Sequence, residues 1–182
     1  RTAKSAAQFL NQVHELAIPM IGMDASLVLC YRDEYKQILS RQRGDFEVLL
    51  AHEWLINKID NKELNPVTPQ TESAKTQYKL FAHCTEKTAL VNTENQWLKI
   101  FAYFGLSLDK VSVGCCGMAG TYGHEKSNFD NSKDLFAMSW QGQINQLDKE
   151  QILATGFSCR SQVKRLAGLK PRHPIEALCA AL

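Results

Sequence analysis

The chain has 182 residues, of which 45% are hydrophobic and 22% charged, and its formal net charge is +2. This composition is typical of a globular protein with one hydrophobic core. The sequence shows no basic stripe with interleaved aromatic residues and no apolar run long enough to cross a bilayer. Nucleic acid as a partner and a transmembrane segment are therefore both excluded.

The six cysteines are too sparse for the disulfide framework of a small secreted protein, which indicates a reducing compartment. We therefore expect a cytoplasmic protein, with attachment to the inner face of the membrane as an alternative. Because the sequence begins with Arg1 rather than methionine, we also expect it to be a fragment of a longer chain.

The first 77 residues are predicted to hold three helices and one short strand, followed by a loop. Apolar residues at helical spacing predict the helices, and a polar, proline-containing stretch predicts the loop. The expected elements are a helix over residues 3–16, a strand over 18–23, helices over 27–40 and 46–59, and a loop over 60–77.

From residue 78 onward, short β-prone apolar runs alternate clearly with helical patterns. Such alternation is typical of a parallel sheet covered on both faces. We therefore predict an α/β fold, a three-layer open and mainly parallel sheet with helices on both faces. The expected elements are strands ending at 83 and spanning 109–114 and 152–155, and helices over 90–104, 132–147, 159–166 and 174–181.

Four cysteines, Cys84, Cys115, Cys116 and Cys159, each come soon after one of these predicted strands. Because parallel strands end at a common edge of the sheet, we expect the four thiols to converge there. Converging thiols are what a metal ion or an iron–sulfur cluster requires. The start of a helix at Cys159 is also expected to favour the thiolate there.

The adjacent pair Cys115-Cys116 distinguishes between kinds of metal site. Structural zinc sites space two cysteines as C-x₂₋₄-C so that both reach one ion. Neighbouring cysteines suit a larger cluster, in which they bind different irons. Gly117, Gly120 and Gly123 follow the pair, and we expect them to let the backbone approach a cluster and direct N–H groups at its sulfurs.

The remaining cysteines and the histidines near the predicted strand ends carry weaker signals. Cys30 and Cys179 fall within predicted helices, where we expect them to pack in the core. His83 and His124 are expected to donate hydrogen bonds near the site rather than to bind metal. His173, which precedes a proline, is expected to begin the last helix.

The run GCCGMAGTYG over residues 114–123 resembles the central motif of the cysteine-rich CCG domain. That domain occurs in a subunit of heterodisulfide reductase, in the iron–sulfur subunit of anaerobic glycerol-3-phosphate dehydrogenase and in the iron–sulfur subunits of glycolate oxidase. His83-Cys84 resembles its first cysteine motif, and residues 155–160 resemble its last. Gly156 stands where the family has the first cysteine of a C-x-x-C pair.

Residues 22–35 resemble the tail of a preceding copy of the motif, in which Leu27 stands where the family usually has cysteine. Residues 172–176 resemble the C-terminal segment of the family. The resemblance implies one domain over 1–182, made of the tail of a preceding β-α unit (1–59), a loop (60–77) and a complete CCG motif unit (78–182). It also implies one [4Fe–4S] cluster bound by the four cysteines near the predicted strand ends.

The chain further resembles the C-terminal end of large fused proteins that join a flavin-binding D-2-hydroxyacid dehydrogenase module to an iron–sulfur module. The resemblance implies an FAD-binding module in the same chain or complex as one partner and a downstream electron acceptor as another. This chain alone is then expected to have no dehydrogenase activity. A zinc-stabilised structural module and a vicinal-thiol redox switch are the alternatives.

Overall fold

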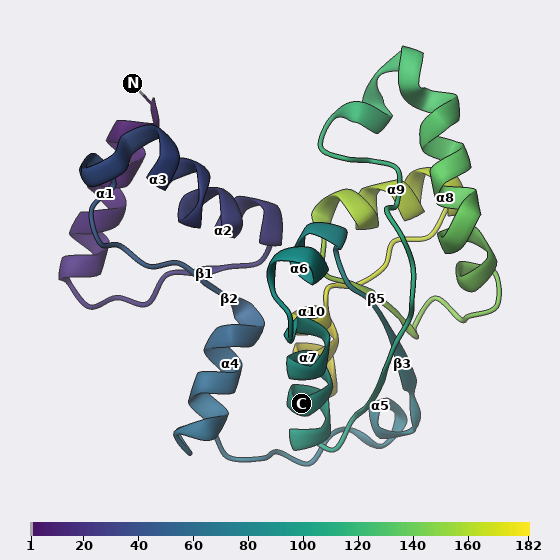
Figure 1. The fold of residues 1–182 in the computed structure, drawn as a ribbon. Coiled ribbons are helices and arrows are strands. Elements are labelled where there is room, and N and C mark those ends of the chain that lie inside the picture. The colour runs from purple at the N-terminus through teal and green to yellow at the C-terminus, as the bar shows by residue number, and fades with distance from the viewer. Residues whose placement is uncertain (1) are drawn as a thin grey trace.

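The computed structural model describes residues 2–182 as helices packed around short parallel strands (Figure 1). The strands are β1 (Ile21–Gly22), β2 (Leu49–Leu50), β3 (Gln77–Phe81), β4 (Ser107–Lys110) and β5 (Ile152–Ala154). The helices are α1 (Thr2–Glu15), α2 (Ala25–Arg32), α3 (Glu34–Leu39), α4 (Ala51–Asp60), α5 (Thr71–Lys75), α6 (Cys84–Ala89), α7 (Thr93–Tyr103), α8 (Phe129–Ile144), α9 (Phe157–Ala167) and α10 (Pro174–Ala181). Short 3₁₀ turns are η1 (Ser40–Arg43), η2 (Tyr122–His124) and η3 (Lys126–Asn128).

The predicted α/β fold is confirmed, because all paired strands are parallel and helices surround them. The strands form two sheets rather than one. β1 pairs with β2, and a three-stranded sheet has the order β4-β3-β5. Within residues 2–182, no helix has the length and apolar character that a membrane span requires.

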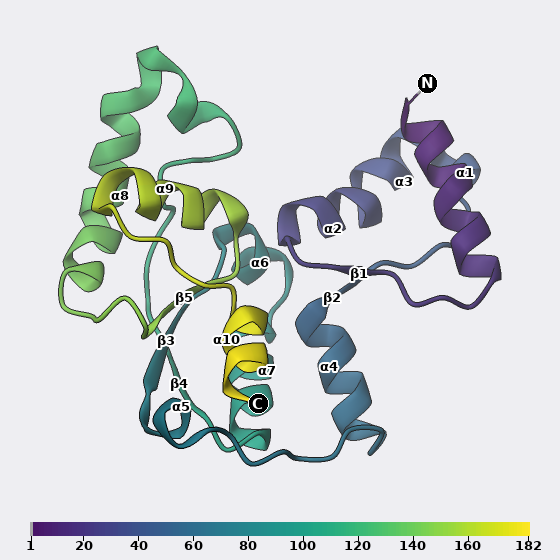
Figure 2. The same ribbon diagram turned by 180° about the vertical axis from the view of Figure 1, so that it is seen from behind.

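The three-stranded sheet lies between two layers of helices (Figures 1 and 2). Successive side chains of a strand point to opposite faces, so Tyr78 and Leu80 of β3 pack on one side while Phe81 packs on the other. The first face is covered by α4, α7 and α10, and the second by α8 and α9. This arrangement leaves the C-terminal edge of the strands free for the loops that carry the cysteines.

The first fifty residues have a hydrophobic core of their own, built by α1, α2 and the β2 region. Here the predicted helix over 46–59 is wrong, because α4 begins only at Ala51. Phe46, Val48 and Leu50 are buried while Glu47 is exposed, which is the period-two pattern of an extended segment. The segment pairs with β1 and turns its apolar side chains toward α1 and α2.

The two cores are tied together by α4 and by Asp24. α4 packs against α7 on the first face of the larger sheet. One Asp24 carboxylate oxygen accepts from the N–H of Ser26 at the start of α2 (3.0 Å), and the other accepts from the N–H of Phe157 at the start of α9 (2.8 Å). The first residues of α2 therefore lie beside the strand edge at which α9 begins.

Candidate metal centre

The structure brings the four predicted cysteines together at the C-terminal edge of the three-stranded sheet. Cys84 is the first residue of α6, three residues after β3, and Cys159 is the third residue of α9, after β5. Cys115 and Cys116 follow the extended segment that continues from β4. The side chain of Cys159 lies close enough to that of Cys116, and the side chain of Cys84 to that of Cys115, to affect the pKa of Cys116 and of Cys115. Thiols from three strand ends thus form one cluster.

The buried thiols of Cys116 and Cys159 affect each other's pKa. The hydrogen bond from Cys159, helped by the backbone N–H of Met118, lowers the pKa of Cys116 to about 7 despite its burial. The same hydrogen bond and burial raise the pKa of Cys159. The expectation that the start of α9 favours a thiolate at Cys159 stays a prediction.

Cys115 is half-buried, and burial raises its pKa although the backbone N–H of Gly117 donates to its sulfur (3.4 Å). Backbone N–H groups of the turn thus point at the sulfurs of both adjacent cysteines. Hydrogen bonds of this kind stabilise thiolates and tune clusters that thiolates bind.

The glycine turn after the cysteine pair is shaped by its contact with α8. Gly117 has φ +85°, and a Cβ built there would lie 2.2 Å from the backbone oxygen of Ser132. At Gly123, a Cβ would lie 2.6 Å from Ser132 Oγ. Gly120 has φ +68° and open space around it. These contacts give Gly117 and Gly123 a packing role, and the role of the three glycines toward a cluster stays a prediction.

His83 lies directly against the cysteine cluster. Its Nε2 is 3.2 Å from Ser158 Oγ, and burial lowers its pKa. A Cβ added to Gly156 would lie 2.3 Å from His83 Cδ2 and 3.1 Å from Cys159 Sγ, so no side chain fits between them. His83 is therefore placed for the hydrogen-bonding role that the sequence predicted, whereas His124 is exposed in η2.

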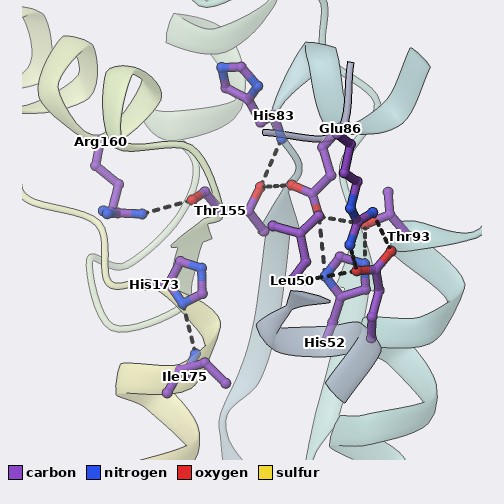
Figure 3. Close-up of polar contacts among 11 residues, drawn as sticks. Leu50, His52, His83, Glu86, Thr93, Thr155, Arg160, His173 and Ile175 are labelled. Atoms are coloured by element: carbon purple, nitrogen blue, oxygen red, sulfur yellow. Dashed lines mark hydrogen bonds and ion pairs between the residues drawn. The ribbon is translucent and has the colours of Figure 1, made fainter. Parts of the chain in front are cut away.

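A buried polar network around Glu86, in the helix that Cys84 begins, was not predicted from the sequence (Figure 3). Glu86 in α6 is 2% exposed and accepts hydrogen bonds from the hydroxyls of Thr93 and Thr155. His52 of α4 lies with its Nδ1 3.6 Å from Glu86, and its Nε2 is 3.1 Å from Thr93 Oγ1. Thr155 Oγ1 also accepts from the backbone N–H of His83 (2.9 Å). The network links α4, α6 and the end of β5.

Burial shifts the pKa values in this network toward the uncharged forms. Burial raises the pKa of Glu86 and lowers the pKa of His52 to about 4. His52 is therefore neutral at pH 7, and its contact with Glu86 is not an ion pair at that pH. The residues that form this network lie far apart along the chain. The sequence therefore showed only polar residues beside the apolar strand ends.

The other predicted residues have mixed outcomes. His173 begins α10 as expected, since its Nδ1 accepts from the N–H of Ile175 (3.2 Å). Cys30 is half-buried in α2, but Cys179 is exposed, so core packing is wrong for Cys179. α10 buries a face that includes Ala177 and Ala181, and Cys179 lies outside this face.

A mononuclear site gains no support from the arrangement. Among residues 2–182, no group of three or more His, Cys, Asp or Glu side chains is placed to hold a single metal ion. A cluster with several metal atoms differs in that each thiolate binds its own iron.

Comparison with curated proteins relates this arrangement to known enzymes. The chain is similar to part of the bacterial D-2-hydroxyglutarate dehydrogenases. It is 54% identical over 178 residues to that of Pantoea ananatis (strain AJ13355) and 52% identical over 178 residues to that of Escherichia coli (strain K12). Each alignment covers 98% of this chain, and the chain spans only 17% of the length of each relative.

A more distant relative is a subunit of the anaerobic glycerol-3-phosphate dehydrogenase of Escherichia coli (strain K12). It is 29% identical over 190 residues, which cover 100% of this chain and 46% of that relative. No protein-family model and no solved structure matches the chain. The expected relation to part of a larger oxidoreductase is supported by these similarities, and the CCG assignment stays a prediction.

Proposed function

We propose that the chain is an iron–sulfur electron-transfer domain of a flavin-dependent oxidoreductase that acts on 2-hydroxyacids. In this proposal Cys84, Cys115, Cys116 and Cys159 bind one [4Fe–4S] cluster. The observation that carries the proposal is the convergence of these thiols from three parallel strand ends at one edge of the sheet.

The donor set and its surroundings fit such a cluster. Four cysteine thiolates are the usual ligands of a [4Fe–4S] cluster. The lowered pKa of Cys116 supplies one thiolate near neutral pH. The backbone N–H groups of Gly117 and Met118 donate to the sulfurs of Cys115 and Cys116. Buried apolar side chains surround Cys116 and Cys159, which limits the access of water. When bound, the cluster would accept and release one electron at a time.

The proposed role of the whole protein rests on the names of its relatives. Because the two closely similar proteins are named D-2-hydroxyglutarate dehydrogenase, we propose that this chain passes on electrons taken from a 2-hydroxyacid by an FAD-binding module. A separate acceptor receives them. We also propose the division into the tail of a preceding unit (1–59), a loop (60–77) and a complete CCG unit (78–182). The separate core of residues 7–50 supports an N-terminal unit, although α4 (Ala51–Asp60) packs on the larger core and α5 (Thr71–Lys75) lies within the expected loop.

The alternatives have less support. Structural zinc sites space two cysteines as C-x₂₋₄-C, and the adjacent pair Cys115-Cys116 departs from that spacing. A thiol switch would use the vicinal pair Cys115-Cys116, whereas such switches usually carry a C-x-x-C motif, and that spacing is absent here. Cys116 is also only 2% exposed, which limits the access of an oxidant.

Serine substitutions in the intact protein test the proposal. We expect Cys115→Ser combined with Cys116→Ser to abolish bound iron and hydroxyacid-dependent reduction of a one-electron dye, because serine is a poor iron ligand. Cys179→Ser is the matched control, since Cys179 is exposed outside the cluster. Unchanged iron content and dye reduction in the double variant would refute the proposal.

A further inference from the structure

A second candidate site lies on the outer side of α9, next to the cysteine cluster. It is a cavity of about 480 Å³ bordered by α9, the start of α10 and Met23. This volume is in the range of small-molecule sites. Three cationic side chains line it, those of Arg160, Lys164 and Lys170, together with the ring of His173.

Arg160 is held in a fixed orientation at the inner end of the cavity. Its Nη1 donates to the backbone oxygens of Ala154 (3.0 Å) and Thr155 (2.9 Å), at the end of β5 (Figure 3). Its Nε and Nη2 have no acceptor among residues 2–182. A guanidinium anchored on one side keeps its remaining donors ready for a carboxylate, so little side-chain entropy is lost on binding.

His173 adds a buried donor beside Arg160. The side chain is 4% exposed, and its Nδ1 accepts from the N–H of Ile175. In the neutral ring the proton is then on Nε2. Burial, followed by the nearby charge of Arg160, lowers the pKa of His173 to about 4, so the ring is neutral at pH 7. The Nε2–H is not taken by any acceptor in residues 2–182.

The cavity has an excess of positive charge, since three cationic side chains but one carboxylate line it, with Asp24 bonded to Phe157 at its border. Lys164 lies four residues after Arg160, on the same face of α9, and Lys170 follows that helix. Neither lysine has a carboxylate within ion-pair distance in the described part of the chain. Glu176 is the one carboxylate among the residues that line the cavity, and it accepts from the backbone N–H of His173 (2.6 Å) as part of the helix cap.

The cavity also offers apolar contact. Met23 and Phe157 line it and are 44% and 67% exposed. Large apolar side chains left exposed around a polar cavity mark binding surfaces. A ligand with an anionic group at each end could pair both groups with the cations, while its carbon chain packs against the apolar side chains.

We propose that this cavity binds a small aliphatic dicarboxylate. One carboxylate would contact Arg160 and His173, the other Lys164 and Lys170, and the carbon chain would lie against Met23 and Phe157. None of these residues is a proposed iron ligand, so the inference does not depend on the cluster.

Hydrogen exchange of the intact protein, followed by mass spectrometry, tests the inference at the site itself. We expect glutarate to slow exchange over residues 157–173. Valerate, a monocarboxylate with the same number of carbons, and inorganic phosphate should do so only at concentrations at least about tenfold higher, because each lacks one half of the contacts.

Variants complete the test. Arg160→Gln and Lys164→Gln should each weaken glutarate protection at least about tenfold, whereas Lys126→Gln, an exposed lysine outside the cavity, should not. Lys164 is itself exposed, so its variant remains informative if Arg160→Gln does not fold. The inference is overturned by an absence of glutarate protection, by equal affinity for valerate or phosphate, or by unchanged affinity in Lys164→Gln.

Discussion

At the scale of single residues, burial shifts the pKa values of ionisable groups near the cysteines toward the uncharged forms. Burial raises the pKa of Glu86 and lowers the pKa of His52 and His173 to about 4. Isolated charges are costly in an apolar interior, so such groups shift their pKa values instead.

The two buried histidines predict an acid-sensitive fold. Between pH 6.5 and 4, the unfolded chain binds protons at His52 and His173 that the folded chain does not. The free energy of unfolding therefore falls as pH drops through this window, by up to about 3 kcal/mol for each histidine. Urea denaturation at a series of pH values, followed by tryptophan fluorescence, measures this loss.

The variant His173→Asn keeps a side chain that can cap α10 but does not titrate. It should lose about 2 kcal/mol less stability than the wild type between pH 6.5 and 4. The matched control is His124→Asn, because His124 is exposed. Equal pH dependence in wild type and His173→Asn would contradict the proposed burial of a neutral ring.

The cysteine positions could be predicted from the sequence, but the buried polar network around Glu86 could not. A thiol after each apolar run is a pattern visible in one dimension, and parallel strand ends bring such positions together. Glu86 meets Thr155 and His52 only through packing between distant segments. No local spacing encodes these pairs.

At the scale of elements, the glycine turn and α8 hold the cysteine pair in place. Ser132 Oγ donates to the backbone oxygen of Gly117 (2.7 Å) and accepts from Gln162 Nε2 (2.8 Å). The turn, α8 and α9 are thus joined at one serine. Trp140 Nε1 also donates to the backbone oxygen of Gly114, just before the cysteines (3.0 Å).

Two glycine substitutions separate backbone strain from packing in this turn. Gly120→Ala should cost only about 1 kcal/mol, because the left-handed backbone is strained but the space is open. Gly117→Ala adds an overlap with the backbone oxygen of Ser132 and should cost about 3 kcal/mol or more. Urea denaturation of the two variants measures the difference, and equal losses would contradict the packing role of Gly117.

The sequence predicts helices better than short strands in this chain. The helix over 174–181 is found with the predicted ends, because His173 and Pro174 mark its start. The segment 46–50 was assigned to a helix, although its buried residues alternate. An apolar run this short fits both the repeat of a helix and the alternation of a strand. Only the pairing of β2 with β1 decides between them.

At the scale of the whole molecule, two cores are joined next to the cysteine edge. Asp24 accepts hydrogen bonds from the first turns of both α2 and α9, and His52 of α4 contacts the network under α6. Movements of the first fifty residues would therefore reach the starts of α6 and α9, which carry Cys84 and Cys159. The chain is only 17% of the length of its close relatives, and this edge is where we expect its electron-transfer partners to approach.

Removal of the Asp24 carboxylate should loosen this junction. Asp24→Ala leaves the first N–H groups of α2 and α9 without their side-chain acceptor, at a cost of about 1–2 kcal/mol. Hydrogen exchange should become faster in both helix starts. Asp33→Ala is the control, since Asp33 precedes α3 without a side-chain cap bond. Faster exchange in α2 alone would contradict a link between the two cores.

The most direct test of the central claim is iron and sulfide analysis of the anaerobically purified protein, together with its absorbance spectrum. Because the chain could lose iron during purification, the protein is first reconstituted with iron and sulfide. We predict a brown protein with about four irons and four sulfides bound through this chain, all lost when Cys115 and Cys116 are changed to serine. A colourless protein that takes up no iron, or one that binds about one zinc instead, would contradict the account.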